Sequence, residues 1–232
     1  MWRIISPSSC KDSAKVLQDY MNDAHPISHL IKINWGNSRL SLSNLVEVWG
    51  NKLEAVARSA DKARFFSLLK DDGTVPVITE FAGPCYQHPD PYGHNGSGIR
   101  YVDREEDFIP GLLTTKQIKG KEFRVYFCYD SSPKIYKKVP LSDGLDSPIR
   151  NSHNGYGYMT NPPELREVPN LKEVLLSLTK QVTNKLELSH GAVDFILSHG
   201  HKVYVLESNS APTLFDHSLV GMFGDTFIRR WV

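Results

Sequence analysis

The sequence of 232 residues has little of several features that would define a protein class. Its three cysteines, Cys10, Cys85 and Cys128, are odd in number, far apart and without CxxC spacing, which disfavours a disulfide framework and a structural zinc site. No apolar run approaches the roughly 20 residues of a membrane-spanning helix, and no signal-peptide pattern is present. The 27 basic and 26 acidic residues leave a net charge of +1. We therefore expect a soluble, cytoplasmic protein without a nucleic-acid or membrane partner.

Familiar catalytic and metal motifs are also missing. The glycine-rich segment "GHNGSG" lacks the spacing of a P-loop, and no HxxxH or HExxH pattern occurs among His88, His94, His153, His199, His201 and His217. We find no catalytic triad. The two arginines of "FIRRWV" are too few to indicate a nucleic-acid surface. Any catalytic function must therefore depend on another set of residues.

Hydrophobic periodicity predicts a small α/β unit at the start of the chain. Strand-like "WRIIS" precedes "SAKVLQDYMNDA", in which Leu17 and Met21 recur at helical spacing, and strand-like "HLIKINWG" follows. The segment 43–73 is expected to be helical in pieces, and its last helix should begin near Asp61 and end at Gly73. We expect two lobes in all.

Further strands and one strong helix are predicted beyond this unit. "VPVITEF" is strand-like, whereas Pro84–Gly98 is expected to be a mobile loop. "EFRVYF" alternates, with Phe123 and Val125 on one face and Glu122 and Arg124 on the other, and a short turn with two serines and a proline leads into "KIYKKV". "NLKEVLLSLTKQVTNKLELS" has the clearest helical spacing of apolar residues in the chain.

The stretch "GAVDFILSHGHKVYVLESNSAPTL" places two acids and an amide in strand-like apolar runs. If the runs pair as a hairpin that turns at His199–Gly200, Asp194 lies opposite Val205 and diagonally across from Glu207. Asn209 follows on the same face. Two carboxylates this close repel each other unless a cation or a proton lies between them. Carboxylate and amide oxygens suit Mg²⁺, so the pattern predicts a magnesium site.

Simpler interpretations compete with each of these motifs. Either acid alone could be a solvent-exposed residue at a strand end, and "GHNGSG" could be an ordinary surface loop. Lys134, Lys137 and Lys138 could form a charged edge strand that resists aggregation. The convergence of three oxygen donors beside "VYVL" favours the metal site, although a register slip of one residue would move Asp194 to the other face.

Five segments together resemble the ATP-grasp ligases, in that family's order along residues 61–215. They are "DKARFFSLLKDDGTVPVIT", "GHNGSGI", "KQIKGKEFRVYF", "KIYKKV" and the acid-bearing hairpin. The resemblance implies an α+β ATP-grasp fold, in which two α/β lobes with antiparallel sheets clamp a nucleotide. It also implies a short N-terminal α/β lobe over residues 1–60, preceding an ATP-grasp domain over residues 61–232.

The resemblance implies an ATP-dependent carboxylate–amine ligase that forms an acyl phosphate and releases ADP and phosphate. The most similar subgroup is the small phage-encoded type, distantly similar to the glutamate ligases that modify ribosomal protein. Such an enzyme would act in the host cytoplasm on small-molecule or peptide carboxylates and amines. Two alternatives remain open: a nucleotide-binding module without catalysis, and an interaction protein.

Residue roles follow from the resemblance, motif by motif. Asp194, Glu207 and Asn209 would bind two Mg²⁺ ions, and Glu207 would bridge them. Arg124 would contact the γ-phosphate and then the acyl phosphate, and Lys138 would join it in catalysis. The nucleotide contacts would be Lys62, Gly96, Ser97, Gly98, Lys116, Ile118 and Lys137. Asn151 is a candidate for the acceptor side.

The chain departs from the family pattern at two places. Family members carry a Lys or Arg shortly before the glycine-rich loop, where this chain has Tyr86 or Gln87, so a cationic phosphate contact is expected to be missing. No acidic residue directly follows "KQIKGK" to bind ribose, although Glu122 comes soon after.

Overall fold

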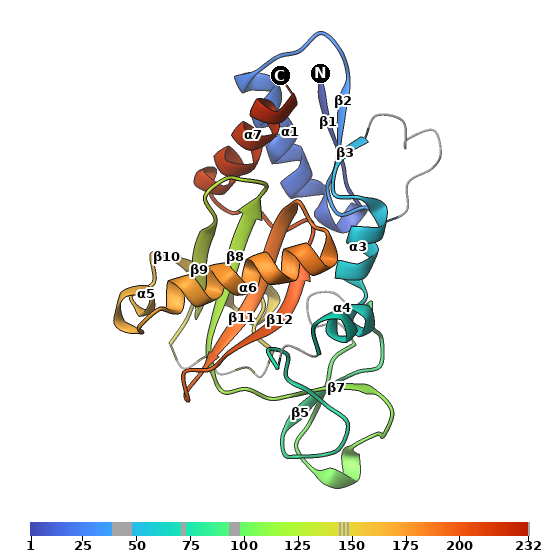
Figure 1. Ribbon diagram of the computed structural model, residues 1–232, viewed down its shortest axis with the longest axis vertical. Coiled ribbons are helices and arrows are strands. Elements are labelled where there is room, and N and C mark those ends of the chain that lie inside the picture. The colour runs from blue at the N-terminus through green and yellow to red at the C-terminus, as the bar shows by residue number, and fades with distance from the viewer. Residues whose placement is uncertain are drawn as a thin grey trace.

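The protein contains three β-sheets that follow one another along the long axis of the molecule (Figure 1). The computed structural model describes residues 1–231 apart from 39–47, 71–72, 93–97, 144, 146 and 148. Within the described part of the chain, no helix is long and apolar enough to cross a lipid bilayer.

The first sheet is parallel and lies at the end of the molecule where both chain termini are found. It consists of β1 (Trp2–Ile5), β2 (Ile31–Asn34) and β3 (Val48–Gly50), with α1 (Lys11–Ala24) connecting β1 to β2. The C-terminal helix α7 (His217–Trp231) packs against α1, and the two termini lie at the same end of the molecule. A Cβ atom on Gly224 would lie 2.5 Å from the Tyr20 ring, so glycine permits this close approach.

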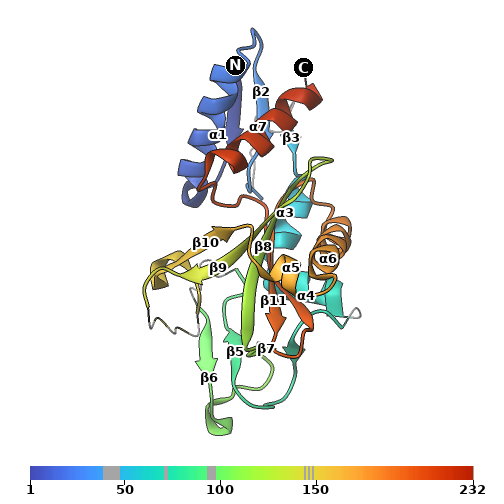
Figure 2. The ribbon, with the colours of Figure 1, turned by 90° about the vertical axis from the view of Figure 1, so that its left-hand side faces the viewer.

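The second sheet is antiparallel and lies at the opposite end (Figure 2). Its order is β4 (Val77–Ile78), β7 (Leu113–Lys116), β5 (Cys85–His88) and β6 (Arg100–Val102). Two short helices, α3 (Leu53–Ala60) and α4 (Lys62–Leu69), precede it. The Asp61 side chain accepts hydrogen bonds from the backbone N–H groups of Ala63 and Arg64 and thereby caps α4.

The third sheet is antiparallel and occupies the middle. Its order is β10 (Tyr156–Thr160), β9 (Lys134–Pro140), β8 (Gly120–Cys128), β11 (His190–Ser198) and β12 (Val203–Asn209). Helices α5 (Glu164–Glu167) and α6 (Leu171–Leu186) follow β10, and α6 crosses one face of the sheet (Figure 1). Phe123, Phe195 and Leu175 belong to the core beneath α6, which leaves the opposite face of the sheet available for a site.

The structure confirms several sequence-based predictions. β8 is the predicted alternating strand, it forms the predicted hairpin with β9, and α6 is the predicted strong helix. Other expectations were wrong. Val48–Gly50 is a strand although it lies in a segment predicted to be helical, and Cys85–His88 is a strand although it lies in the predicted loop. Gln87 and His88 are buried in β5 through polar contacts with Thr114 and Thr115. Buried polar residues hide the alternation by which a strand is recognised in sequence.

Candidate active site

A cavity of about 740 Å³ opens on the face of the third sheet that α6 does not cover. Residues of α4, of β5 and of the segment after β7 also line it, so it lies between the second and third sheets. Its charged lining residues are Lys62, Lys116, Lys119, Glu122, Arg124, Lys138, Arg150, Asp194 and Glu207. These six cations and three carboxylates leave an excess of three positive charges, whereas the whole chain carries +1. The cavity is therefore suited to an anionic ligand.

The pair Asp194 and Arg124 lies at the centre of this lining. The two residues are directly opposite each other on β11 and β8. Arg124 Nε and Nη2 donate to Asp194 Oδ1 and Oδ2, both at 2.5 Å, and both residues are buried. Burial opposes ionisation of each group, but the bidentate pairing outweighs it and lowers the pKa of Asp194 while raising that of Arg124. Both groups are therefore charged at neutral pH.

Glu207 lies directly opposite Asp194, not on the diagonal that the sequence predicted. The register pairs Phe195 with Val205 and then Asp194 with Glu207, so Leu206 is the extra residue of a β-bulge. Without the bulge, alternation would place Glu207 on the α6 side of the sheet. The predicted pairing of Asp194 with Val205 was wrong, but the bulge brings the two acids to one face.

The Glu207 carboxylate is less closely paired with a cation than the Asp194 carboxylate is. Its nearest approach to Arg124 is 4.0 Å, and 45% of its side chain is exposed. Partial removal of the carboxylate from water and repulsion by Asp194 raise the pKa of Glu207. The positive charges of Lys62, Arg124 and Lys138 lower it and offset this rise in part. A cation bound next to Glu207 would relieve the repulsion.

Asn209 lies on the same face, since its strand partner is Ala192, two residues before Asp194. Its Oδ1 accepts a hydrogen bond from the Ala211 backbone N–H at 3.0 Å, which fixes the amide orientation. All three residues line the cavity. Among the described residues, no group of three His, Cys, Asp or Glu side chains could hold a metal, so the amide oxygen of Asn209 would have to complete the donor set. Two carboxylates and an amide oxygen fit a hard cation such as Mg²⁺.

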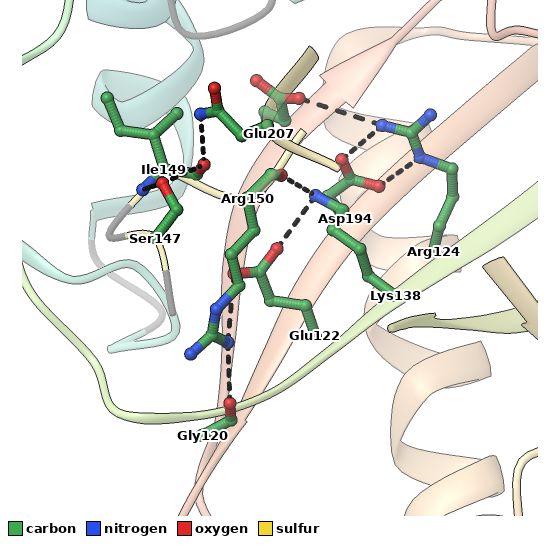
Figure 3. A network of polar contacts seen from close by, with 10 residues as sticks. Gly120, Glu122, Arg124, Lys138, Ser147, Ile149, Arg150, Asp194 and Glu207 are labelled. Carbon is green, nitrogen blue, oxygen red and sulfur yellow. Dashed lines mark hydrogen bonds and ion pairs between the residues drawn. The ribbon is translucent and has the colours of Figure 1, made fainter. Parts of the chain in front are cut away.

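Lys138 is held in an ionic network on the same face (Figure 3). Its Nζ lies 2.9 Å from Glu122 and donates to the backbone carbonyl of Arg150 at 2.9 Å. Arg150 in turn donates to the backbone carbonyl of Gly120 at 2.9 Å and lies 3.4 Å from Glu122. Burial opposes the charge of Lys138, but Asp194 and Glu122 raise its pKa, so the ammonium group stays charged.

The structure separates the two adjacent lysines that the sequence could not orient. Lys138 lines the cavity, whereas Lys137 does not and donates to Glu164 of α5 at 2.6 Å. The two side chains alternate across β9, so only one can reach the site. The predicted nucleotide contact through Lys137 is not supported by this placement.

The other predicted nucleotide contacts are placed as follows. Lys62, Lys116, Ile118 and Asn151 line the cavity. Gly98 is not among the lining residues, and Gly96 and Ser97 lie outside the described residues.

The strand before the glycine-rich segment carries no Lys or Arg. Tyr86 lines the cavity, whereas Gln87 points away and bonds to the backbone of Ile109. His88, which the sequence analysis did not single out, also lines the cavity. Burial, together with the nearby charge of Lys62, lowers the pKa of His88 to about 4, so this position is neutral at physiological pH.

Sequence reasoning also missed Arg150 and Phe215, both of which line the cavity. Each lies in a segment between regular elements, where neither spacing nor alternation marks a residue as part of a site.

Comparison with known proteins gives one curated relative and several similar structures. No family model matches the sequence. A D-alanine–D-alanine ligase from Dechloromonas aromatica (strain RCB) is 28% identical over 130 residues, which span 52% of this chain and 42% of that enzyme. The match thus spans less than half the length of the curated relative.

Solved structures of similar enzymes match nearly the whole chain. D-alanyl-alanine synthetase A from Vibrio cholerae superposes with a TM-score of 0.67 at 14% identity, covering 98% of this chain and 96% of that chain. D-alanine–D-alanine ligase from Bacillus anthracis, complexed with ATP, superposes with a TM-score of 0.63 at 15% identity, covering 99% and 96%. These enzymes are ATP-grasp superfamily members, and the predicted α+β ATP-grasp fold is confirmed.

Proposed function

We propose that this chain, which has the ATP-grasp fold, is an ATP-dependent carboxylate–amine ligase. The observation that carries the proposal is the cationic cavity in which Arg124 and Lys138 lie beside Asp194 and Glu207. Charges of both signs at one end of a nucleotide-sized cavity fit the transfer of a phosphoryl group. The similarity to D-alanine–D-alanine ligases supports the same reaction class.

We place the nucleotide along the cavity from the segment after β7 towards the sheet. Main-chain groups of Lys116 and Ile118 would bind the adenine edge, and Lys62 would bind the phosphates. Gly96, Ser97 and Gly98 remain proposed phosphate contacts through their backbone N–H groups. Asp194, Glu207 and Asn209 would hold one or two Mg²⁺ ions, which when bound would neutralise phosphate charge.

The proposed reaction has two steps and needs no protein nucleophile. A substrate carboxylate oxygen attacks the γ-phosphorus of ATP, the bond to the β-phosphate oxygen breaks, and ADP leaves. An amine then attacks the carbonyl carbon of the acyl phosphate, loses a proton and expels phosphate. Arg124 and Lys138 stabilise the negative charge on the transferred phosphoryl group, and their fixed positions avoid reorganisation during the reaction.

The ionic contacts of Arg124 and Lys138 support these roles. Asp194 holds both donor edges of the guanidinium in place, and Glu122 with the Arg150 carbonyl holds the ammonium group. Each cation is therefore fixed before substrate binds, which is the condition for electrostatic stabilisation of a transition state.

We also propose roles for the two parts of the chain and a cellular location for the enzyme. Residues 61–232 would form the ATP-grasp domain and supply the nucleotide site, and residues 1–60 would form a short N-terminal lobe. The two parts meet closely at Gly36, where a Cβ atom would lie 2.4 Å from the Ala211 side chain. From the sequence resemblance we propose a phage-encoded enzyme that acts in the host cytoplasm.

The rival function is nucleotide binding without catalysis, favoured by the neutral residues Tyr86, Gln87 and His88 on β5. Hydroxylamine separates the two functions, because it replaces the amine and traps an acyl phosphate as a hydroxamate. The protein is incubated with MgATP, hydroxylamine and a panel of carboxylates that begins with D-alanine, the substrate in the name of the curated relative. Carboxylate-dependent hydroxamate and ADP support the ligase. Nucleotide binding without either product supports the module.

A further inference from the structure

Phe215 is a half-exposed aromatic residue that lines the cavity and is held rigidly in place. The stretch between β12 and α7 presents it, and 41% of its surface remains accessible. Tyr158 stacks on its ring with a centroid distance of 4.9 Å and an interplanar angle of 6°. The rings of Tyr136 and Tyr126 are steeply inclined to it, at 81° and 69°, with centroid distances of 5.0 and 6.1 Å. Three neighbouring strands thus fix a ring that remains open to the cavity.

The chain on both sides of Phe215 is also tied to the sheet. The Tyr126 hydroxyl donates to the backbone carbonyl of Thr213 at 3.1 Å. The Tyr136 hydroxyl donates to the Asp216 carboxylate at 2.8 Å. This support fixes the ring in advance of any ligand, so little conformational entropy would be lost when a ligand packs on it.

This aromatic surface adjoins the proposed phosphoryl-transfer site. The Arg124 guanidinium carbon lies 5.1 Å from the centre of the Tyr158 ring, and Tyr158 is paired with Lys138 across β9 and β10. A carboxylate that reaches Arg124 and Lys138 would therefore have its carbon skeleton near Phe215.

The lining that β10 and the stretch after β12 contribute around Phe215 is uncharged. Thr213 and Phe215 come from the stretch after β12, and Tyr156, Gly157 and Tyr158 come from β10. Burial raises the pKa of Tyr158, so its hydroxyl is neutral. A second carboxylate packed against these uncharged side chains would lose hydration without a compensating contact from them, whereas an apolar group would not, which favours an apolar group here.

We propose that Phe215 is the platform for the carbon skeleton of the acyl substrate, and that this substrate is a monocarboxylate bearing a flat apolar group. The inference rests on the proposed ligase function. An aromatic group on the substrate would pack against the accessible part of the Phe215 ring, and the carboxylate would meet Arg124 and Lys138.

Calorimetry with two matched acids, 3-phenylpropanoate and propanoate, tests the platform. Both are titrated into the protein with Mg²⁺ and a non-hydrolysable ATP analogue, and succinate and D-alanine are titrated alongside. We expect 3-phenylpropanoate to bind at least about tenfold more tightly than propanoate, because the phenyl ring is removed from water. In Phe215→Ala this ratio should fall by about two- to tenfold, the range expected for loss of one aromatic pair.

Two further variants distinguish stacking from a loss of fold. Trp49→Ala removes an aromatic ring of similar exposure, 47%, that does not line the cavity, and the ratio should stay at the wild-type value. Phe215→Leu keeps an apolar side chain, so its ratio should lie between wild type and Phe215→Ala. Equal binding of the two acids to wild type, a ratio unchanged in Phe215→Ala, or tighter binding of succinate or D-alanine would overturn the platform.

The hydroxylamine assay on the same acids keeps the two proposals apart. Hydroxamate from several acids without preference for the aromatic one retains the ligase and rejects the platform. Selective binding of 3-phenylpropanoate that depends on Phe215, without hydroxamate from any acid, retains Phe215 as a binding platform for an aromatic carboxylate but rejects the ligase, and with it the role of that acid as an acyl substrate.

Discussion

Asp194 and Glu207 face each other directly across β11 and β12 because the strand pair bulges at Leu206. The two carboxylates differ in their surroundings. Asp194 is neutralised by a bidentate bond to Arg124, whereas Glu207 lies 4.0 Å from that guanidinium and is repelled by Asp194. The pair therefore combines a fixed, paired anion with one that gains from an added cation, and the first two predictions follow from this contrast.

Binding of MgATP should raise the melting temperature. At a concentration about 100 times Kd the expected gain is about 2.7 kcal/mol, or roughly 5–10 °C for a chain of this size. Differential scanning fluorimetry with ATP alone, MgATP, and MgATP plus EDTA separates the contributions of nucleotide and metal. An unchanged melting curve in MgATP would count against both the ligase and the module without catalysis.

Glu207→Gln should raise or preserve the stability of the unliganded protein while weakening function. The raised folded-state pKa means that ionised Glu207 costs stability, a cost that is absent at low pH and appears as pH rises through its ordinary value of 4.5 and above. The neutral amide removes this cost, so the stability gain over wild type should be present at pH 7 and vanish near pH 4. Turnover should fall by about 100-fold, as is typical when one electrostatic group is lost.

Glu173→Gln is the control for this substitution, since Glu173 is exposed on α6, across the sheet from the cavity. Unfolding of Glu207→Gln without ligand would show that the acid holds the fold instead of a metal.

Arg124→Ala should destabilise the protein by about 3–5 kcal/mol, because it leaves Asp194 buried and unpaired. Adding Asp194→Asn to that variant should recover part of the loss, since the buried charge is removed. Urea unfolding of both single variants and the double variant gives the coupling energy. If the two effects simply add, Arg124 and Asp194 do not act as a pair.

Arg124→Lys tests catalysis with less damage to the fold. A lysine keeps the charge but cannot make the bidentate contact. We expect a larger fall in kcat than in nucleotide affinity, because the cation matters most when charge moves on the transferred phosphoryl group. A fall confined to nucleotide binding would reject the proposed role.

Lys137→Met should lower the free energy of unfolding at neutral pH and make it depend less on pH in the acid range. Burial opposes ionisation of Glu164, but hydrogen bonds from Lys137 and Lys121 lower its pKa to about 2. The ionised form therefore contributes stability above pH 4.5 that is lost as pH falls towards 2. Without Lys137 the folded-state pKa of Glu164 should be less depressed, so its contribution to stability at neutral pH should be smaller and should be lost completely at a higher pH, as measured by urea unfolding between pH 2 and 7.

Lys138→Met is the matched variant on the other face of the same strand. It should reduce turnover and leave the acid dependence of Glu164 at its wild-type value, because Lys138 pairs with Glu122. The reverse pattern, with turnover dependent on Lys137, would contradict the orientation of β9.

The sequence by itself determined the features that depend on local pattern. Alternation in "EFRVYF" fixed which face of β8 carries Arg124, and the apolar spacing in α6 fixed the helix that covers the other face. Two acids and an amide in otherwise apolar runs marked the site, because such residues are costly in a sheet unless they have a function or a partner. The order of the motifs along the chain was enough to indicate the ATP-grasp fold.

Only the tertiary structure decided what depends on contacts between distant segments. The bulge at Leu206, the orientation of Lys138 and the burial of His88 on β5 each result from pairing with a strand elsewhere in the chain. Arg150 and Phe215 enter the cavity from irregular segments, so no sequence periodicity marks them. Local spacing sets which face a side chain takes, but register and the approach of loops are set by long-range packing, and these bring the residues together into one site.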